Sequence, residues 1–200
     1  ILDVIRQAGY DLFPSKGLQQ PAPNPMTGNG IITYNITKSE SLKSYNLTNA
    51  MIDGLLEFDG KSIGSMAQER FWDVKNMMWY GPGGIGTTRG LKGFQDNHQI
   101  PFLKAFPNRG VFEEDETTNF VNIAEGNYTC HFGYPIMNGK HTGDGWLGLK
   151  PTNKSFTMRV MDFWRREEDR LKENWVMIDM IDVLEQFNID VFQLLKTYKN

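Results

Sequence analysis

The sequence has almost no cysteine, no excess of one charge sign and no long apolar run, and each lack excludes a class of protein. Its single cysteine, Cys130, cannot form an intrachain disulfide or a cysteine-rich metal centre. The net charge of -3 gives no electrostatic reason to expect nucleic acid or an acidic membrane as a partner. No stretch approaches the roughly 18 consecutive apolar residues of a membrane helix. We therefore expect a protein of a reducing compartment, the cytoplasm, without a membrane or nucleic-acid partner.

Residues 1–45 differ in composition from the rest of the chain. A short helix-like start precedes residues 15–30, which are rich in proline, glycine and asparagine and indicate an extended segment. The run "IITYNIT", residues 31–37, could form a short strand. We interpret residues 1–45 as an arm or linker and residues 46–200 as the folded domain, which is long enough to bury a core.

Within the folded domain the hydrophobic period changes from helical to strand-like. Apolar residues first recur at helical spacing, and the expected helices are 49–59, 65–73 and 91–106, the last broken near Pro101. Alternating runs follow, and the expected strands are 119–126, 128–136, 145–150, 155–166 and 170–179. A last helix carries its apolar stripe on Leu184, Phe187, Val191 and Leu195. This order predicts an α+β domain with an antiparallel sheet rather than an alternating βαβ series.

A glycine-rich loop, "WYGPGGIGTTRG", holds Gly81, Gly83 and Gly86 at the spacing G-x-G-x-x-G of a dinucleotide-binding loop. The context argues against that function. Pro82 has no N–H to offer a phosphate, and the preceding run lacks the valine and isoleucine of a buried parallel strand. We therefore expect a wide turn in which glycine fills positions of positive φ, and no nucleotide cofactor.

Four segments of the domain resemble the SnoaL-like family of polyketide cyclases. They read "WYGPGGIGTTRGLKGF", "PFLKAFPNR", "HTGDGWLGLKPT" and "RVMDFWRREEDRLKENWVMID", and the resemblance covers roughly residues 48–197. Trp175 and Asp179 match the Trp-x-x-x-Asp at the end of that family's last strand. Asn153 replaces the glycine of the family's usual Pro-Thr-Gly, which is a mild departure because asparagine also tolerates a left-handed turn.

The resemblance implies a nuclear transport factor 2-like, cystatin-like fold, in which a curved antiparallel sheet forms a cone that packed helices close. Its apolar pocket would hold a small or polyketide-like molecule. Cyclases of the family close a ring in a polyketide ester without a cofactor or a metal, and an aspartate at the end of the last strand moves the proton. That position is Asp179 here. Many relatives only bind a ligand, and many pair through the open face of the sheet, so a homodimer is expected.

Two aspartates are the first candidates for acid–base catalysis. Asp179 follows apolar residues on one side of its strand, and burial there would raise its pKa toward neutrality. The alternative is that Asp179 caps the last helix. Asp162 lies on an otherwise apolar side of its strand and would be a second buried acid. The alternative for Asp162 is an ion pair with Arg159 or Arg165.

Two histidines complete the set of candidate catalytic residues. His98 shares a helical face with Phe94 and Phe102, so it points either into the pocket or into the core. His141 stands at a strand edge and is either an acid or base or a residue that stabilises a turn. His131 adjoins Cys130, and neighbouring strand residues face opposite sides, so these two cannot form a nucleophilic pair. No two histidines have ligand spacing, so we expect no metal.

The candidate substrate-binding residues are aromatic, with one arginine. Aromatic side chains commonly line pockets for planar or apolar ligands and equally often fill ordinary cores. Arg89 could hold a carboxylate by a bidentate contact, and its alternative is a plain surface position. The aromatic candidates are Trp79, Tyr80, Trp146, Trp164 and Trp175.

Three functional hypotheses follow. The first is a SnoaL-like enzyme that performs cofactor-free proton transfer next to a carbonyl, such as aldol cyclisation, dehydration or isomerisation. The second is a binding module of the same fold without turnover, and the third is a structural dimerising domain. The fold alone does not decide between them, because function depends on the site.

Overall fold

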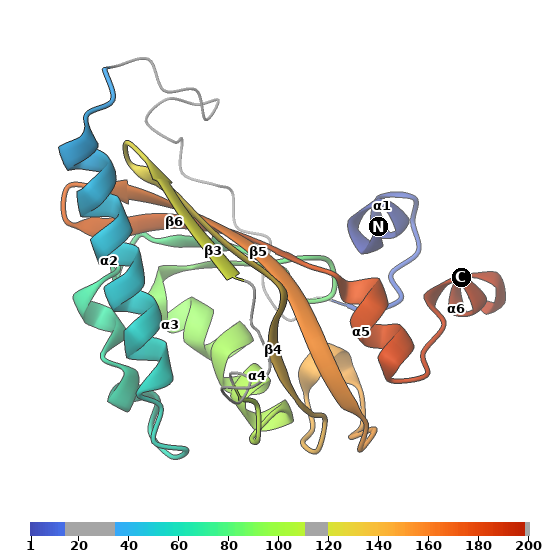
Figure 1. The fold of residues 1–200 in the computed structure, drawn as a ribbon. Coiled ribbons are helices and arrows are strands. Elements are labelled where there is room, and N and C mark those ends of the chain that lie inside the picture. The colour runs from blue at the N-terminus through green and yellow to red at the C-terminus, as the bar shows by residue number, and fades with distance from the viewer. Residues whose placement is uncertain (15–34, 111–119, 199–200) are drawn as a thin grey trace.

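The computed structural model describes residues 1–14, 35–110 and 120–198 (Figure 1). The expected extended segment at residues 15–30 and most of the possible strand at 31–37 lie outside these ranges. Residues 35–37 are described and carry no strand.

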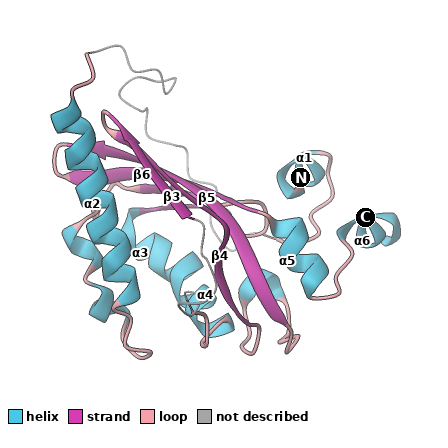
Figure 2. Ribbon diagram, in the orientation of Figure 1, coloured by secondary structure: helices cyan, strands magenta, loops and turns pink. Residues whose placement is uncertain are grey.

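A curved sheet of six strands organises the fold, with helices packed against it (Figures 1 and 2). The strands are β1 Met78–Tyr80, β2 Thr87–Arg89, β3 Phe120–Glu125, β4 Tyr128–Lys140, β5 Ser155–Glu167 and β6 Arg170–Ile178. Their order is β2-β1-β6-β5-β4-β3, and every neighbouring pair is antiparallel except β1 and β6, which are parallel. The predicted α+β class with a curved sheet is thereby confirmed, with one parallel pair added.

The helices begin where polar caps and a proline favour them. They are α1 Leu2–Gln7, α2 Lys38–Leu56, α3 Gly90–Phe94, the π-helix η3 Gln95–Gln99, α4 Ile100–Ala105, α5 Met180–Gln186 and α6 Val191–Thr197, with 3-10 turns η1 Ile63–Met66, η2 Gln68–Arg70 and η4 Trp146–Gly148. The Thr37 side chain accepts a hydrogen bond from the Glu40 N–H and caps α2. Pro101 lies in the first turn of α4, which continues directly from η3. Because α2 begins at Lys38, it runs across position 45, where the composition of the sequence changes.

The strand expected at residues 145–150 is wrong. This segment contains the 3-10 turn η4 instead. Gly145 has a φ of 107° and Leu147 a φ of 52°, and left-handed backbone of this kind cannot continue a strand.

The sheet has two faces with different neighbours. We call the face toward α2, α3 and α4 the inner face and the other the outer face. The hydroxyls of Thr48 on α2 and Thr129 on β4 lie 2.8 Å apart, which fixes the inner side. Trp164 is the partner of Thr129 in the β4–β5 register, so the alternating set predicted for β5 faces inward. Its apolar members Phe156, Met158, Val160 and Trp164 are all buried.

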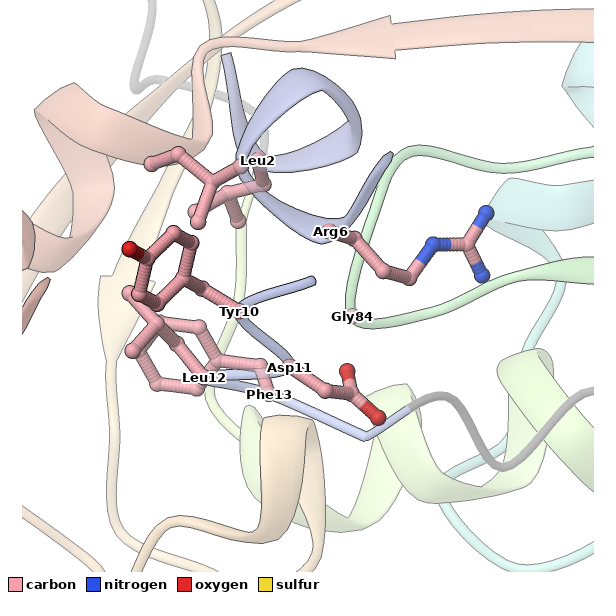
Figure 3. Close-up of a pocket in the computed structure, with 8 residues that line it drawn as sticks. Leu2, Arg6, Tyr10, Asp11, Leu12, Phe13 and Gly84 are labelled. Atoms are coloured by element: carbon pink, nitrogen blue, oxygen red, sulfur yellow. The ribbon is translucent and has the colours of Figure 1, made fainter. Parts of the chain in front are cut away.

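The glycine-rich loop holds the N-terminal segment rather than a phosphate. The Gly83 N–H donates to the Asp3 carboxylate at 3.1 Å, so an acid of the same chain occupies that donor. A Cβ on Gly83 would lie 3.0 Å from Leu2, and Gly84 has a φ of 90°. Leu2, Ile5 and Phe13 are part of the core, and together with Gly84 of the loop they line a small hollow (Figure 3).

Candidate functional site

A carboxyl group on the inner face is the central feature of the site. Asp162 projects from β5 and accepts a hydrogen bond at Oδ1 from Asn174 Nδ2 on β6, at 3.1 Å. The same Asn174 amide donates to the Phe163 carbonyl, which fixes its orientation. Burial raises the pKa of Asp162 from 3.8 to about 7, although the Asn174 hydrogen bond lowers it. Asp162 therefore changes its protonation state close to neutral pH.

A histidine lies next to this carboxyl group. His131 on β4 is the register partner of Asp162, so the two side chains are neighbours on one face of the sheet. His131 Nδ1 is hydrogen-bonded to Asn122 Oδ1, and Asn122 Nδ2 donates to Asn49 Oδ1 on α2 at 2.8 Å. This direction places the proton on Nδ1 and leaves the lone pair on Nε2. Burial lowers the pKa of His131, which favours the neutral ring.

A second histidine and a tryptophan extend the site toward α3 and α4. Trp79 on β1 is the register partner of Asn174, and its ring stacks on His98 with centroids 4.2 Å apart and an interplanar angle of 17°. His98 belongs to the π-helix η3, an irregularity that frequently occurs at functional sites. Burial lowers the pKa of His98 to about 3, so its ring is neutral. Trp79 and His98 together form an uncharged aromatic wall.

The Trp79 ring keeps its place because Gly81 has no side chain. A Cβ on Gly81 would lie 2.1 Å from Trp79 Cζ3 and 2.8 Å from the Gly86 carbonyl oxygen. Real Cβ atoms do not approach other atoms so closely, so any larger residue at position 81 would displace the Trp79 ring. The first glycine of the loop thus serves the aromatic wall.

Trp164 is the fourth sequence candidate on the inner face. It follows Asp162 by two residues on β5, and its register partners are Thr129 and Asn174. Its side chain is 4% exposed, and its ring lies 6.4 Å from the His131 ring at an angle of 63°. The indole Nε1 is buried and has no hydrogen-bond partner among the described residues.

Asp179 lies outside this group. Its side chain is 43% exposed, its Oδ1 accepts from the Asp182 N–H at the start of α5, and its Oδ2 lies 3.7 Å from Arg159 NH1. The expected desolvation of Asp179 is therefore wrong, and the alternative role as a helix cap is observed. The physical reason is parity: Asn174, Val176 and Ile178 of β6 face inward, and the residues between them face outward.

His141 and Trp146 lie at the other end of the molecule. His141 is fully buried at the end of β4, roughly 30 Å along that strand from His131 at about 3.3 Å per residue. Its Nδ1 is 3.2 Å from Thr152 Oγ1, and its ring stacks on Phe187 with centroids 4.9 Å apart. Burial is the main cause that lowers its pKa. Trp146 is 2% exposed and packs edge-on against Phe106. Both residues are placed as core residues.

The remaining candidates occupy the outer face and its rim. The Tyr80 ring stacks on Trp175 with centroids 5.5 Å apart, and the Tyr80 hydroxyl donates to Glu173 Oε1 at 2.9 Å. Burial and this hydrogen bond raise the pKa of the Tyr80 phenol. Glu173 also accepts from Arg165 Nε at 2.5 Å, and both ionic side chains are buried. Arg89 is exposed at the end of β2.

The site thus contains Asp162, His98, Trp79 and Trp164 from the sequence candidates. Sequence reasoning missed His131 and the three amides of Asn49, Asn122 and Asn174. His131 was considered only as a partner for Cys130. The signal that could have found it is strand parity, because a polar residue opposite Asp162 must share its face, but parity is useful only once the register is known.

Neither a metal centre nor a membrane span emerges from the described residues. Within residues 1–14, 35–110 and 120–198, no group of three or more histidine, cysteine, aspartate and glutamate side chains is arranged to hold a metal ion. No helix in these same ranges is long and apolar enough to cross a membrane.

Comparison with solved structures identifies the fold. A proposed polyketide cyclase from Acidithiobacillus ferrooxidans has a TM-score of 0.54 at 17% identity, covering 73% of this chain and 94% of that one. AclR, a proposed hydroxylase from Streptomyces galilaeus, has a TM-score of 0.54 at 14% identity, covering 74% and 86%. An NTF2-like protein from Burkholderia thailandensis has a TM-score of 0.51 at 14% identity, covering 72% and 95%. At these identities the likeness concerns the fold alone.

Comparison of sequences identifies the family. No curated protein matches the chain. The family model described as "SnoaL-like polyketide cyclase" matches residues 69–187, which include the strands and the histidines of the site. This match covers more than half of the sequence, and it agrees with the resemblance found in the residues themselves. The chain belongs to the family of SnoaL-like polyketide cyclases.

Proposed function

We propose that this protein is an enzyme that moves a proton next to a carbonyl group of a small, largely apolar molecule, without a cofactor. Ring closure of a polyketide-like ester is the reaction of this kind that the family membership favours. Asp162 is the general base and acid. The observation that carries the proposal is the buried Asp162 carboxyl, whose pKa of about 7 is matched to proton transfer at neutral pH.

The environment of Asp162 supports chemistry rather than a structural role. A buried carboxylate is normally compensated by a cation, and here its hydrogen-bond partner is the neutral Asn174 amide. Neither arginine considered as an ion-pair partner serves it, because Arg159 pairs with Asp179 and Asp182, and Arg165 pairs with Glu173. The carboxyl group therefore holds a proton that it releases near neutral pH.

His131 supplies a second site for that proton. The Asn49–Asn122–His131 chain keeps the imidazole in the tautomer that carries its proton on Nδ1. His131 is the register partner of Asp162, so its neutral imidazole lies on the same face as the carboxyl group. Such a pair can take a proton from carbon and return it elsewhere on the substrate.

The aromatic wall supports a planar or apolar substrate. The buried Trp79 ring, beside Asn174 in the register, stacks on the half-buried ring of His98, so this part of the inner face is uncharged and aromatic. Asp162 and His98 are both half-buried, so part of each side chain stays accessible although burial dominates its pKa. Side chains that are partly accessible and have pKa values shifted by burial suit a ligand that enters between the sheet and the helices.

A binding module without turnover is the second candidate function. It is favoured by Asp179, the residue that matches the aspartate of the family motif, because this side chain is an exposed helix cap. If the family's proton transfer requires that position, the chain has kept the fold and lost the chemistry.

The test is a screen of polyketide-like methyl esters and cyclic ketones, followed by kinetics on the best substrate. We expect kcat to rise with pH through about 7, as the Asp162 carboxylate forms. Asp162→Asn should lower kcat roughly 100- to 10,000-fold. The matched control is Asp190→Asn, a second helix-capping aspartate remote from the site, which should leave kcat unchanged. Full activity in Asp162→Asn with loss in Asp179→Asn would return the role of base to Asp179.

We also propose that the protein is a cytoplasmic homodimer that pairs through the outer face of the sheet. Val121, Ile123 and Met177 share that face and are 44%, 53% and 48% exposed, which favours a covering partner. Light scattering of the purified chain tests this proposal, and a strictly monomeric mass at micromolar concentration would contradict it.

A further inference from the structure

We infer that the indole N–H of Trp164 is the hydrogen-bond donor for the substrate oxygen on which negative charge develops. This inference rests on the proposed function and assigns to it a second catalytic residue and a substrate class. The juxtaposition that carries it is a buried, unpartnered N–H two residues from Asp162 on the same face of β5.

The state of the Trp164 Nε1 requires an explanation. Buried polar groups almost always find a partner, because an unpaired donor loses its bonds to water without compensation. Trp72 follows this rule, since its Nε1 donates to Gln68 Oε1 at 3.1 Å. Trp164 is only 4% exposed, yet its Nε1 has no hydrogen-bond partner among the described residues. A donor of this kind is what a ligand oxygen can satisfy.

The position of Trp164 distinguishes it from the other unpartnered indole. Trp146 also has a buried, unpaired Nε1, but it packs against Phe106 and Phe187, with no carboxyl group in either contact. Trp164 instead belongs to a block of inner-face neighbours that includes Asp162, His131 and Asn174. Residues i and i+2 of a strand are about 7 Å apart. That span accommodates a carbonyl oxygen bonded to one residue and the adjacent carbon facing the other, each within about 3 Å.

The step balances as follows. The Asp162 carboxylate removes a proton from the carbon next to a ketone or ester carbonyl, so the C–H bond breaks and an O–H bond forms on Asp162. The C–H electron pair forms a C=C bond, and the carbonyl π electrons move to oxygen, giving an enolate. The Trp164 N–H donates to that oxygen, and its bond strengthens as the charge grows. Attack of the enolate carbon on a second carbonyl forms a C–C bond and an alkoxide, and the alkoxide takes the proton back from Asp162. Without a second carbonyl, Asp162 returns the proton to a carbon of the enolate system.

The same contacts define the substrate class. Trp164 offers a neutral donor, so the oxygen it selects is a carbonyl that becomes charged during the reaction rather than a carboxylate or phosphate. The flat, uncharged wall of Trp79 and His98 favours a conjugated or aromatic carrier for that carbonyl. We therefore assign a planar, enolisable ketone or ester as the substrate. A phenolate imitates its enolate.

The experiment measures the binding of phenols of graded acidity, from phenol to 4-nitrophenol, by calorimetry at pH 6. Wild-type protein, Trp164→Phe, Asp162→Asn and the control Trp72→Phe are compared. In the wild type, affinity should rise with the acidity of the phenol. In Trp164→Phe the affinity for 4-nitrophenol should fall roughly 10- to 100-fold, and the dependence on acidity should flatten. Trp72→Phe should keep the dependence on acidity, because its N–H already has a partner.

Two results would overturn the inference. One is an unchanged dependence on phenol acidity in Trp164→Phe, and the other is absence of phenol binding to the wild type. If Trp164→Phe does not fold, the wild type decides by NMR, because the indole N–H signal of Trp164 should move downfield with 4-nitrophenol while that of Trp72 stays. An unmoved Trp164 signal also contradicts the inference.

Failure of the proposed function gives a different pattern. If Asp162 is not the base, Asp162→Asn retains turnover, yet it should still bind phenols through Trp164. If Trp164 is not the donor, Asp162→Asn loses turnover while Trp164→Phe binds phenols as the wild type does.

Discussion

Each face of the sheet carries a carboxyl group, and the two groups differ in their partners: one has a cationic partner and the other a neutral one. On the outer face Glu173 receives the Arg165 guanidinium and the Tyr80 hydroxyl, so its charge is compensated. On the inner face Asp162 receives the Asn174 amide, and burial raises its pKa to about 7. A buried carboxylate with a cationic partner has its charge compensated and stabilises the fold, whereas one with a neutral partner takes up a proton and becomes available for chemistry.

The largest effect should follow from breaking the outer pair. Arg165→Met leaves Glu173 buried without a cation and should lower the free energy of unfolding by about 3–5 kcal/mol. The surface pairing of Arg159 with Asp179 is the matched control, and Arg159→Met should cost at most about 1 kcal/mol. Urea unfolding at pH 7 measures both values.

A double variant sharpens this prediction. Arg165→Met combined with Glu173→Gln removes both charges and keeps an acceptor for the Tyr80 hydroxyl, so it should recover most of the stability lost in the single variant. Equal losses in the single and double variants would show that Arg165 acts through packing rather than through charge.

The inner carboxyl should instead destabilise the fold when it ionises. The folded protein holds the Asp162 proton up to a pKa of about 7, and the unfolded chain releases it near 3.8. The contribution of Asp162 to the free energy of unfolding therefore falls as pH rises between these values, by at most about 1.4 kcal/mol per pH unit. Asp162→Asn should gain stability relative to the wild type as pH rises from 4 to about 7.

The pH dependence of the free energy of unfolding must be measured for the wild type and for Asp162→Asn, and the difference between the two taken. The pKa values of His98 and His131 are lowered by burial, so both groups change stability in the opposite direction over part of the same range. Their effects cancel when Asp162→Asn is subtracted from the wild type, provided their pKa values are the same in both. A flat difference for Asp162→Asn would contradict the assignment of its pKa.

The smallest of these effects should come from the support of the aromatic wall. Gly81→Ala forces the Trp79 ring to move and should cost about 1–3 kcal/mol, as overpacked positions do. Gly93→Ala in α3 is the control, because its Cβ would meet nothing closer than 3.9 Å, and helix propensity makes it neutral or stabilising. Thermal unfolding distinguishes the two, and an equally neutral Gly81→Ala would mean that the Trp79 ring adapts.

The sequence was informative about elements and less so about which way β6 faces. Periodicity located most helices and strands, and it grouped Asp162 correctly with the apolar side of β5, which the structure turns inward. The face to which Trp175 and Asp179 of the last strand segment point was not predicted, and a bulge between β5 and β6 is the reason. Glu167 pairs with Arg170 at the hairpin, and continued pairing would bring Trp175 opposite Asp162. The irregularity after Arg165 shifts the register by one residue, so Val176 lies there instead.

That single shift turns Trp175 and Asp179 to the outer side and brings Asn174 to the inner one. Side-chain alternation along one strand can be read from the sequence, but the position of a bulge depends on pairing between strands. The neighbour of Asp162 on β4, His131, was missed for the same reason. The local chemistry was therefore predictable one strand at a time, and the group formed across three strands was not.

The measurement that tests the central claim most directly is the titration of the Asp162 carboxyl carbon by NMR, with Asp162→Asn used to assign its signal. The contrast between the two faces predicts a midpoint near pH 7 for Asp162. A midpoint near pH 4 would mean that Asp162 is an ordinary ionised carboxylate, and the proposed acid–base site would then have lost its physical basis.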